Sequence, residues 1–369
     1  MHNEFSSPPP RPVLRLYNRG MALALPILDP GPQRPAFAQG PRSLSAVKLL
    51  RISVTDRCNL RCLYCMPDEG MTFAPAGDVL SAQQVVAVAT AARAAGVTHF
   101  KLTGGEPTLR PDLEDIVTRL AALKPVELSM TTNGLKLGRA GLAQRLANAG
   151  LDRVTVSLDA LDEPTFAQVT GGRGFKLADV WRGIEAAEAA GLGRVKLNVV
   201  VIGGVNDQQV ADFAALTRNR PWTVRFIEYM PLGDSHLTGR GADAFTVDNA
   251  DLRADIAAAH GPLQPLTRDG EPGVGPAQLY QLDGAAGRLG FISAMSQPFC
   301  ETCNRLRLTA TGELRACLFD GGEVDLMPAL TDPAGPDPGA LHALMAACVS
   351  QKPEVHSGRG NRAMSQLGG

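Results

Sequence analysis

The sequence has little net charge of either sign and no long apolar run. Its 36 lysines and arginines nearly balance 37 aspartates and glutamates, which leaves a formal charge of −1 over 369 residues. Such a chain has no overall field that attracts nucleic acid or an anionic membrane, so an anionic ligand needs a local cationic site. The longest uncharged apolar run covers only residues 21–28 and contains Pro26. A bilayer requires roughly twenty apolar residues, so we expect neither a membrane span nor nucleic-acid binding.

Cysteine is also scarce, with seven residues in the whole chain. An odd number in a long chain argues against a secreted disulfide framework and favours metal or catalytic use in a reducing compartment. We therefore expect a cytoplasmic protein. Six of the seven cysteines fall into two tight groups.

Composition divides the chain into three parts. Residues 1–46 carry nine prolines and show no periodicity, which predicts a disordered Pro-rich extension. Pro26 and the short apolar run argue against a signal peptide there, and a start codon assigned too early, with Met21 as one alternative, is another explanation. The other two parts are residues 47–232 and 233–369.

Residues 47–232 alternate short β-branched runs with Ala-rich amphipathic segments, as in repeated βα units around a parallel sheet. Ser81–Ala95, for example, begins with a capping serine, precedes Gly96 and is predicted as a helix. Six such units predict an α/β fold, an incomplete (β/α)6 TIM-type barrel with its chemistry at the carboxyl ends of the strands. The predicted strands are Leu50–Thr55, Thr98–Thr103, Val126–Thr131, Arg153–Leu158, Val195–Val201 and Val224–Glu228.

Residues 233–369 lose this alternation and become rich in Gly, Pro and Asp. Short strands are predicted at Gln278–Leu282 and Arg288–Ser293, and a helix at Leu341–Val349. We expect a smaller C-terminal α+β region that closes the barrel mouth.

The first cysteine group, Cys58, Cys62 and Cys65, has the spacing C-x3-C-x2-C and follows the first predicted strand. Three neighbouring thiolates can hold one inorganic centre, but a zinc site or a fully protein-ligated iron–sulfur cluster uses four ligands. The spacing alone leaves two alternatives: a zinc site with a distant fourth ligand, or a cluster with an open iron that binds a substrate or cofactor.

The second group, Cys300, Cys303 and Cys317, again offers three ligands. A zinc ribbon completed by a distant residue is one alternative, and a second open cluster is the other. Arg305 and Arg307 alternate, so on a strand they share one face and suit a phosphate or carboxylate, unless they are merely solvated. The candidates for a fourth zinc ligand are His342, Cys348 and His356.

Two features together resemble the radical S-adenosylmethionine (radical SAM) superfamily. One is the first cysteine group with Tyr64 before its last cysteine, and the other is the run 103–107, Thr-Gly-Gly-Glu-Pro, one βα unit later. The resemblance implies a 4Fe-4S cluster whose open iron takes the amino and carboxylate groups of S-adenosylmethionine, with the Gly-Gly-Glu-Pro run holding the methionine amino group.

With the second cysteine group, the chain from Leu49 onward resembles the GTP 3′,8-cyclases of molybdenum cofactor biosynthesis, which are lyases. Shared runs include Thr-Thr-Asn-Gly at 131–134 and Arg-Phe-Ile-Glu-Tyr-Met at 225–230. The resemblance implies two 4Fe-4S clusters, one on each cysteine group, and radical chemistry carried by the cofactor with no catalytic side chain. It assigns Tyr64, Gly105, Ser157 and Met230 to S-adenosylmethionine, Arg51, Lys101, Thr131, Lys196, Arg305 and Arg307 to GTP, and Gly368 and Gly369 to a tail that enters the active site.

All of these binding residues are expected at or just beyond strand ends. Lys101 departs from the family, which usually has arginine there, and a lysine keeps the charge but loses the bidentate fork.

The resemblance also implies a reaction and its partners. One electron from a donor cleaves S-adenosylmethionine to methionine and a 5′-deoxyadenosyl radical, which removes the 3′ hydrogen of GTP. The C3′ radical then attacks C8, and the aminyl radical so formed is reduced to give (8S)-3′,8-cyclo-7,8-dihydroguanosine 5′-triphosphate, which passes to cyclic pyranopterin monophosphate synthase. Family members tend to be homodimers.

Two alternatives remain from the sequence. A radical SAM maturase with an auxiliary cluster usually has more extra cysteines, whereas Cys348 is the one spare cysteine here and is predicted to be a small apolar residue on a helix. An iron–sulfur carrier or zinc-stabilised scaffold would not require the Gly-Gly-Glu-Pro run or two incomplete ligand sets.

Overall fold

The computed structural model describes residues 42–67, 71–233, 235, 237, 242–267, 274–321, 323–358, 360 and 362–367. Most of the expected Pro-rich extension, including the segment considered as a signal peptide, lies outside these residues. The predicted tail residues Gly368 and Gly369 also lie outside them.

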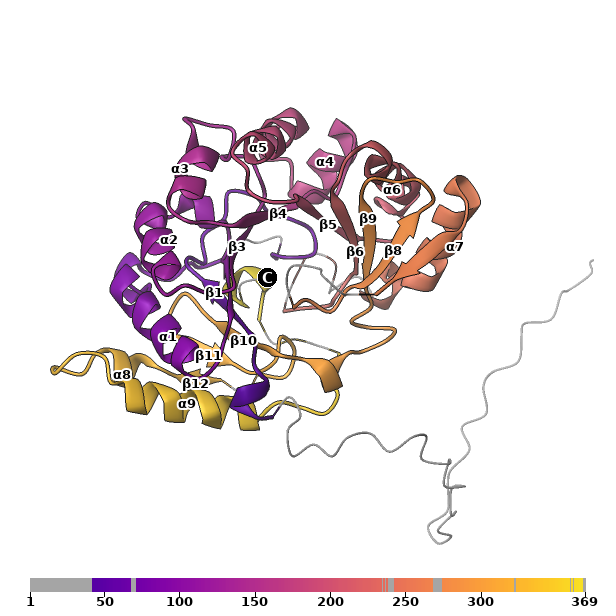
Figure 1. Ribbon diagram of the computed structural model, residues 1–369. Coiled ribbons are helices and arrows are strands. Elements are labelled where there is room, and N and C mark those ends of the chain that lie inside the picture. Colours follow the sequence, from indigo (N-terminus) through magenta and orange to yellow (C-terminus); the bar gives the residue numbers. More distant parts are fainter. Residues whose placement is uncertain are drawn as a thin grey trace, which may run out of the picture. The chain divides into compact units, whose positions relative to one another are not determined.

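A twelve-stranded sheet organises the described chain, in the order β12-β11-β10-β1-β2-β3-β4-β5-β6-β9-β8-β7. Its six central strands run parallel to their neighbours, as the βα alternation predicts. The two ends of this order do not pair with each other among the described residues, so the predicted incomplete TIM-type barrel is confirmed (Figure 1). The central strands are β1 (Leu49–Ser53), β2 (His99–Thr103), β3 (Glu127–Thr132), β4 (Arg153–Ser157), β5 (Lys196–Val201) and β6 (Thr223–Glu228).

Helices connect successive central strands and cover the outside of the barrel (Figure 1). The first begins at a reciprocal capping box in which the Ser81 side chain accepts from the Gln84 backbone N–H and the Gln84 side chain accepts from the Ser81 N–H. It ends before Gly96, whose φ of +94° suits glycine. These helices are α1 (Ala82–Ala94), α2 (Leu113–Ala121), α3 (Leu142–Asn148), α4 (Glu163–Thr170), α5 (Leu177–Ala189) and α6 (Val210–Asn219), and α7 (Asn249–His260) follows the last central strand.

Strands that follow β6 in sequence extend the central sheet at both edges. The strand β10 (Arg305–Leu308) runs parallel to β1, and β9 (Arg288–Ile292) runs parallel to β6. The sequence patterns before and after residue 232 therefore contribute strands to one sheet. Beyond these strands the pairing is antiparallel, with β11 (Glu313–Arg315) and β12 (Val324–Asp325) at one edge and β8 (Gln278–Leu282) and β7 (Leu263–Leu266) at the other.

Helix α7 was not predicted, because its Ala-rich sequence lies in a region that is otherwise rich in Gly, Pro and Asp. The predicted helix near the C-terminus is present as α9 (Pro338–Ser350), which packs against α1. The Asp337 side chain caps its start by accepting from two backbone N–H groups. Two shorter helices are α8 (Met327–Leu330) and α10 (Met364–Leu367).

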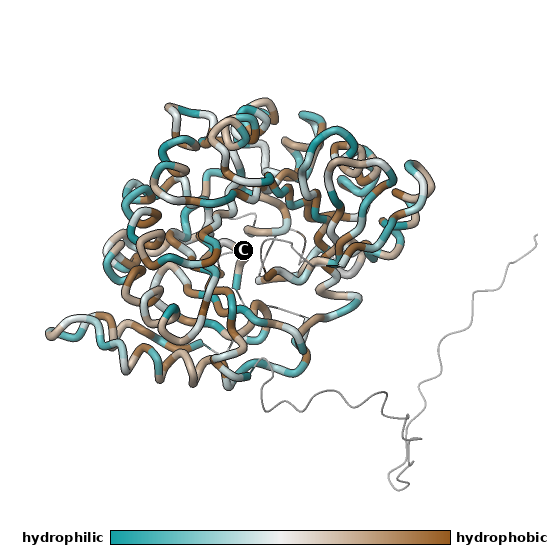
Figure 2. Tube along the Cα trace, viewed as in Figure 1, coloured by the Kyte–Doolittle hydropathy of each residue, from teal (hydrophilic) through white to brown (hydrophobic). Residues whose placement is uncertain are grey.

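The central strands separate an apolar outer layer from a polar interior. On β1, Leu50 and Ile52 are completely buried in the hydrophobic core, whereas Arg51 between them lines a pocket inside the barrel. This follows from the two-residue alternation of strand side chains. Hydrophilic positions recur along the helices that surround the barrel (Figure 2). The barrel interior is therefore free to hold charged and sulfur-containing side chains.

Candidate active site

One pocket inside the barrel collects both cysteine groups and every described residue that we assigned to a ligand. The cysteines that line it are Cys58, Cys62, Cys65, Cys300, Cys303 and Cys317. The other predicted residues that line it are Arg51, Tyr64, Lys101, Gly105, Thr131, Ser157, Lys196, Met230, Arg305 and Arg307. The structure thus brings together side chains that are spread over most of the sequence.

The first cysteine group lies on the loop after β1. Burial raises the pKa of Cys62 well above the usual range of a thiol, and nearby charge on Cys65, Asp159 and Cys58 raises it further. Thiols that repel one another's charge in this way become stable thiolates when they ligate metal. Within the described residues, no three His, Cys, Asp or Glu side chains converge tightly enough for a single ion. Three cysteines on one loop beside the pocket suit an iron–sulfur cluster that each of them binds through its thiolate.

Glycines 104 and 105 bring the loop after β2 against this cysteine loop. The Gly105 N–H donates to the Thr55 carbonyl at 2.7 Å, and the Glu106 N–H donates to the Arg57 carbonyl at 2.8 Å. A Cβ on Gly105 would lie 2.2 Å from the Arg57 carbonyl oxygen, a distance that no side chain tolerates. The close approach therefore requires glycine, and it sets the backbone of this loop beside the cysteines.

Glu106 fastens the same loop to the end of β3. One carboxylate oxygen accepts from the hydroxyls of Thr108 at 2.6 Å and Thr132 at 2.7 Å, and the other accepts from the Asn133 N–H at 2.7 Å. Burial nevertheless raises the pKa of this carboxyl, against the effect of the donors. Glu106 therefore holds this loop against the end of β3 through buried hydrogen bonds.

Tyr64 ties the first cysteine loop to β4 and β5. Its hydroxyl donates to Asp159 Oδ2 at 2.9 Å, while Asp159 Oδ1 accepts from the Val200 N–H at 2.7 Å. Burial raises the pKa of Asp159 to about 6. Because the Tyr64 hydroxyl is used inside the protein, its ring and backbone are the parts left to face a ligand.

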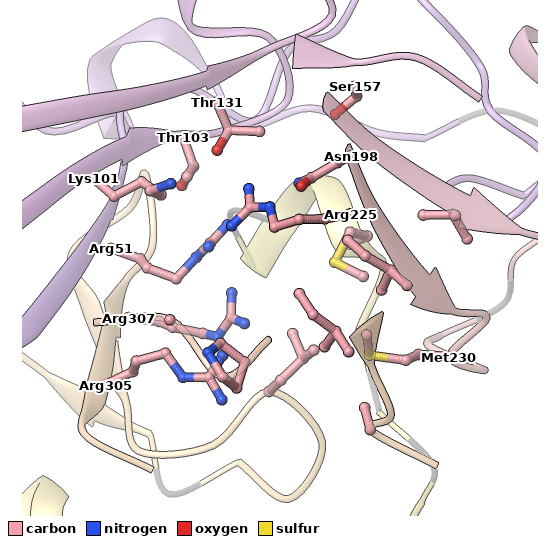
Figure 3. Close-up of a pocket in the computed structure, with 18 of the residues that line it drawn as sticks. Arg51, Lys101, Thr103, Thr131, Ser157, Asn198, Arg225, Met230, Arg305 and Arg307 are labelled. Carbon is pink, nitrogen blue, oxygen red and sulfur yellow. The ribbon is translucent and has the colours of Figure 1, made fainter. Parts of the chain in front are cut away.

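A row of cations crosses three neighbouring strands. Arg307 on β10 is aligned with Arg51 on β1, and Arg51 is aligned with Lys101 on β2. Figure 3 shows these side chains, together with Arg225 and Arg305, extending toward the same cavity. In parallel strands, aligned residues stand on the same face of the sheet, so the row presents its charges to one ligand.

The cations of this row lower one another's pKa. Burial lowers the pKa of Arg51, and the charges of Arg307, Arg305 and Arg225 lower it further. Burial and the Arg305 charge lower the pKa of Arg307 to about 9. The pKa of Lys101 falls well below its usual value for the same reasons. An anion bound here would relieve both the repulsion and the desolvation.

The expectation that all of these residues lie at or beyond strand ends is wrong for Arg51, Lys101 and Arg307. Arg51 and Lys101 lie in the middle of their strands, and Lys196 is the first residue of β5. Ser157, by contrast, is the last residue of β4, and Gly105 follows β2. Any inward-facing position along a barrel strand can line the interior. The site therefore has two levels: a deep level that contains these cations, and a level at the carboxyl ends of the strands that contains Ser157 and Gly105.

Sequence reasoning missed several polar residues of the pocket. Asn198 on β5 is aligned with both Ser157 on β4 and Arg225 on β6. Asn198 Oδ1 and Thr103 Oγ1 are buried, and neither has a hydrogen-bond partner within the part of the chain that the structure describes. Both side chains lie at the cavity in Figure 3. Unpaired buried polar atoms in a pocket indicate a polar ligand, and the sequence signal was a polar residue within an otherwise apolar strand.

A buried ion pair lies at the amino ends of β3 and β4, and it was also missed. Arg153 Nη2 lies 2.5 Å from Glu127 Oε1, and both side chains line the pocket. Burial alone would raise the pKa of Glu127, but the Arg153 charge lowers it. This carboxylate offsets part of the positive charge at the deep level of the pocket.

The second cysteine group faces the cation row from β10 and the loops beside it. Arg305 Nη2 lies 3.8 Å from Cys303 Sγ, and its guanidinium lies 5.0 Å from the centre of the Phe299 ring. Burial alone would raise the pKa of Cys303, but the charges of Arg305 and Lys352 lower it to about 6. A lowered pKa favours the thiolate form in which Cys303 would ligate a metal.

The three candidates for a fourth zinc ligand do not support a zinc ribbon. His342 is exposed on α9, and Cys348 is buried on the same helix with its thiol 3.5 Å from the Leu314 carbonyl. His356 lines the pocket, but both of its ring nitrogens are engaged, with the Ala294 carbonyl at 2.7 Å and the Gly358 N–H at 3.0 Å. Within the part of the chain that the structure describes, none of these three candidates is placed as a fourth ligand of this group.

Comparison with known proteins agrees with this geometry. Residues 52–217 match the family model for the Radical SAM superfamily, and residues 222–358 match that for Molybdenum Cofactor Synthesis C. A protein of Pelotomaculum thermopropionicum named GTP 3′,8-cyclase is 46% identical over 88% of this chain and 98% of its own length. Proteins of the same name from Nostoc punctiforme and Moorella thermoacetica are 44% and 43% identical over 88% of this chain and 100% and 98% of their own lengths.

Proposed function

The chain belongs to the GTP 3′,8-cyclase family within the radical SAM superfamily, and we propose that its pocket holds S-adenosylmethionine beside the first cysteine group and GTP between the cation row and the second. It is a radical SAM enzyme of molybdenum cofactor biosynthesis that converts GTP to (8S)-3′,8-cyclo-7,8-dihydroguanosine 5′-triphosphate. Its cofactors are two 4Fe-4S clusters and S-adenosylmethionine.

The observation that carries this proposal is the convergence of two incomplete cysteine sets and a buried cation row on one pocket. Each set lacks one ligand of a closed cluster. An iron left open at each set can therefore bind S-adenosylmethionine on one side of the cavity and substrate on the other.

Cys58, Cys62 and Cys65 would hold the first cluster, and Cys300, Cys303 and Cys317 the second. When bound, the first cluster and S-adenosylmethionine supply the radical that removes a hydrogen atom from the substrate. Gly105, Ser157, Met230 and the ring of Tyr64 line the carboxyl-end level, where they would orient the methionine and adenosine parts.

The cation row suits the triphosphate of GTP, which brings about four negative charges to a nearly neutral protein. Arg51, Lys101 and Arg307 are fixed relative to one another by strand register. Lys196 and Thr131 line the same pocket, and Arg225, which the sequence analysis did not assign, joins this group. These residues would hold the phosphates deep in the barrel while Arg305 faces the second cluster.

The barrel supplies orientation and exclusion of water. Holding the substrate's C3′ next to the hydrogen-abstracting group lowers the entropic barrier, and keeping other hydrogen donors out protects the radical. No side chain needs to act as acid or base in this scheme.

Gly368 and Gly369 are proposed as a tail that enters this pocket. They lie outside the described residues, but Met364 of the preceding helix α10 lines the pocket. Deleting both glycines should lower cyclisation more than folding, and an unchanged product yield would reject the tail.

We further propose a one-electron donor, a homodimer, and hand-over of the product to cyclic pyranopterin monophosphate synthase. No described helix is long and apolar enough to cross a membrane. A cytoplasmic location is supported by the seven cysteines, none of which is in a disulfide, because clusters require reduced thiols.

Anaerobic reconstitution tests the proposal. The purified chain should bind about eight irons, as two 4Fe-4S clusters require, and with reductant and S-adenosylmethionine it should form 5′-deoxyadenosine only when GTP is present. About one zinc per chain, as a single structural site would hold, with no cleavage of S-adenosylmethionine, would reject it.

A further inference from the structure

The segment Lys352–His356, here called the C-terminal strap, runs along the second cysteine group. Lys352 directly follows the last turn of α9 and is only 3% exposed. Its Nζ lies 2.6 Å from the Arg305 carbonyl, 2.9 Å from the Cys303 carbonyl and 3.5 Å from Cys303 Sγ. The three protons of an ammonium group thus match three acceptors around one cysteine.

The contact with sulfur distinguishes this lysine from an ordinary backbone clamp. A buried ammonium is costly unless it is paired with negative charge. The Cys303 thiol, 3.5 Å from Nζ, becomes such a negative group when it ligates a metal. The cysteine group therefore offers the negative partner that this buried ammonium requires.

His356, at the other end of the strap, contacts the rest of the group. Its backbone hydrogen bonds to the Cys300 thiol. Its ring stacks on Phe319, two residues after Cys317, with centroids 4.1 Å apart and planes 16° apart. The strap consequently touches Cys303 and Cys300 directly and the neighbourhood of Cys317 through Phe319.

We propose that Lys352 is a positioning residue of the second cluster, an inference that rests on the proposed function. Lys352 holds Cys303 in place and donates an N–H···S hydrogen bond that stabilises the reduced cluster. Hydrogen bonds to cluster sulfurs and nearby positive charge favour the more negative, reduced state. Loss of the ammonium should therefore lower the reduction potential of this cluster without affecting the first cluster.

The test uses the full chain with Cys58, Cys62 and Cys65 replaced by Ser, so that only the second cluster gives a signal. Lys352→Met removes the charge and the donors at similar length, and Lys352→Arg keeps the charge. Lys48→Met is the matched control, because Lys48 is an exposed lysine whose Nζ contacts only the Ser45 carbonyl among the contacts described for it. Iron and sulfide content, the midpoint potential from EPR-monitored titration and the melting temperature of the iron-free chain are measured for each.

We expect Lys352→Met to have a lower midpoint potential than its parent, Lys352→Arg to lie closer to the parent, and Lys48→Met to match it. An unchanged potential in an iron-loaded Lys352→Met chain would overturn the proposal. If the Met variant does not retain iron, an unchanged melting temperature of the iron-free chain supports positioning of the ligands, and a lowered one shows a structural role and overturns the proposal.

Together with the GTP assay of the wild-type chain, this experiment separates the inference from the proposed function. A wild-type chain that cyclises GTP while Lys352→Met leaves the potential unchanged refutes only the role of Lys352. A wild-type chain that forms no cyclic product, although the potential depends on Lys352, refutes the function and leaves the strap's role intact.

Discussion

Arg51 of β1 stands directly opposite Arg307 of β10 in a parallel pair of strands. The two residues lie far apart in sequence. Burial and the Arg307 charge lower the pKa of Arg51, and the Arg51 charge contributes to the lowered pKa of Lys101. Two buried like charges at this spacing destabilise the ligand-free protein. A polyanionic substrate accounts for their presence. Removing one of the two arginines should therefore stabilise the ligand-free protein and lower its activity.

Replacing Arg307 by Met should reduce kcat/KM for GTP about 10- to 100-fold, the loss expected for a charge-assisted hydrogen bond. The same change should leave iron content intact and stabilise the ligand-free chain, because the repulsion with Arg51 is removed. Steady-state kinetics, iron analysis and thermal unfolding check these outcomes. Arg119→Ala is the control, since Arg119 is an exposed arginine paired with Asp115 on α2. Loss of iron in Arg307→Met would show that this arginine is structural.

Lys101 should make GTP binding weaken as the pH rises. Burial and the charges of Arg225, Arg153 and Arg51 lower its pKa, and phosphate favours its protonated form, so KM should increase once the pH passes this pKa. Lys101→Arg stays protonated and should give a flatter alkaline profile. Parallel KM profiles of the two proteins between pH 7 and 9.5 would contradict this assignment.

The lowered pKa of Lys101 should make the ligand-free protein more stable, not less, as the pH rises. Since the unfolded chain holds the Lys101 proton to higher pH than the folded chain, folding releases a proton between the two pKa values. Stability should therefore rise with pH in that window, and the rise should be absent in Lys101→Arg. Urea unfolding of the ligand-free proteins at several pH values measures it.

Gly105→Ala should destabilise the protein by about 1–3 kcal/mol, as overpacking does, and impair S-adenosylmethionine binding, because the new Cβ would meet the backbone of Arg57. Gly77→Ala is the matched control, since a Cβ there has open space. Thermal unfolding and equilibrium binding compare the two. Equal stability and binding in both variants would show that the loop after β2 can shift to accommodate the new Cβ.

Glu106→Ala should cost about 1–3 kcal/mol for each buried donor that it leaves unpaired, chiefly the Thr132 hydroxyl and the Asn133 N–H. Glu106→Gln keeps one acceptor oxygen and should recover part of the loss. Denaturant unfolding of the iron-free proteins measures both. If Glu106→Ala were as stable as the wild type but unable to bind S-adenosylmethionine, Glu106 would face the ligand directly.

The sequence revealed the features that depend on neighbouring residues. The Ser81 cap, the glycine after α1 and the alternation of strands and helices are local patterns, and the structure has them where they were predicted. The two cysteine groups were found in the same way, because their ligands are close in sequence.

The remaining features depend on pairing between distant segments. Nothing near Arg305 indicates that its strand adds to β1 at one edge of the barrel, while β9 adds to β6 at the other. Arg225 and Asn198 were missed because their inward orientation follows from strand register. Arg51 and Lys101 were expected at strand ends for the same reason, since local sequence does not show how deep a barrel position lies.

The central claim is that one pocket holds S-adenosylmethionine and GTP with C3′ of GTP at the hydrogen-abstracting position. GTP deuterated at C3′, supplied anaerobically to the reconstituted enzyme with S-adenosylmethionine and a reductant, tests it most directly by mass spectrometry of the 5′-deoxyadenosine formed. The account predicts one deuterium in that product together with the cyclic nucleotide. Unlabelled 5′-deoxyadenosine, formed equally with and without GTP, would contradict it.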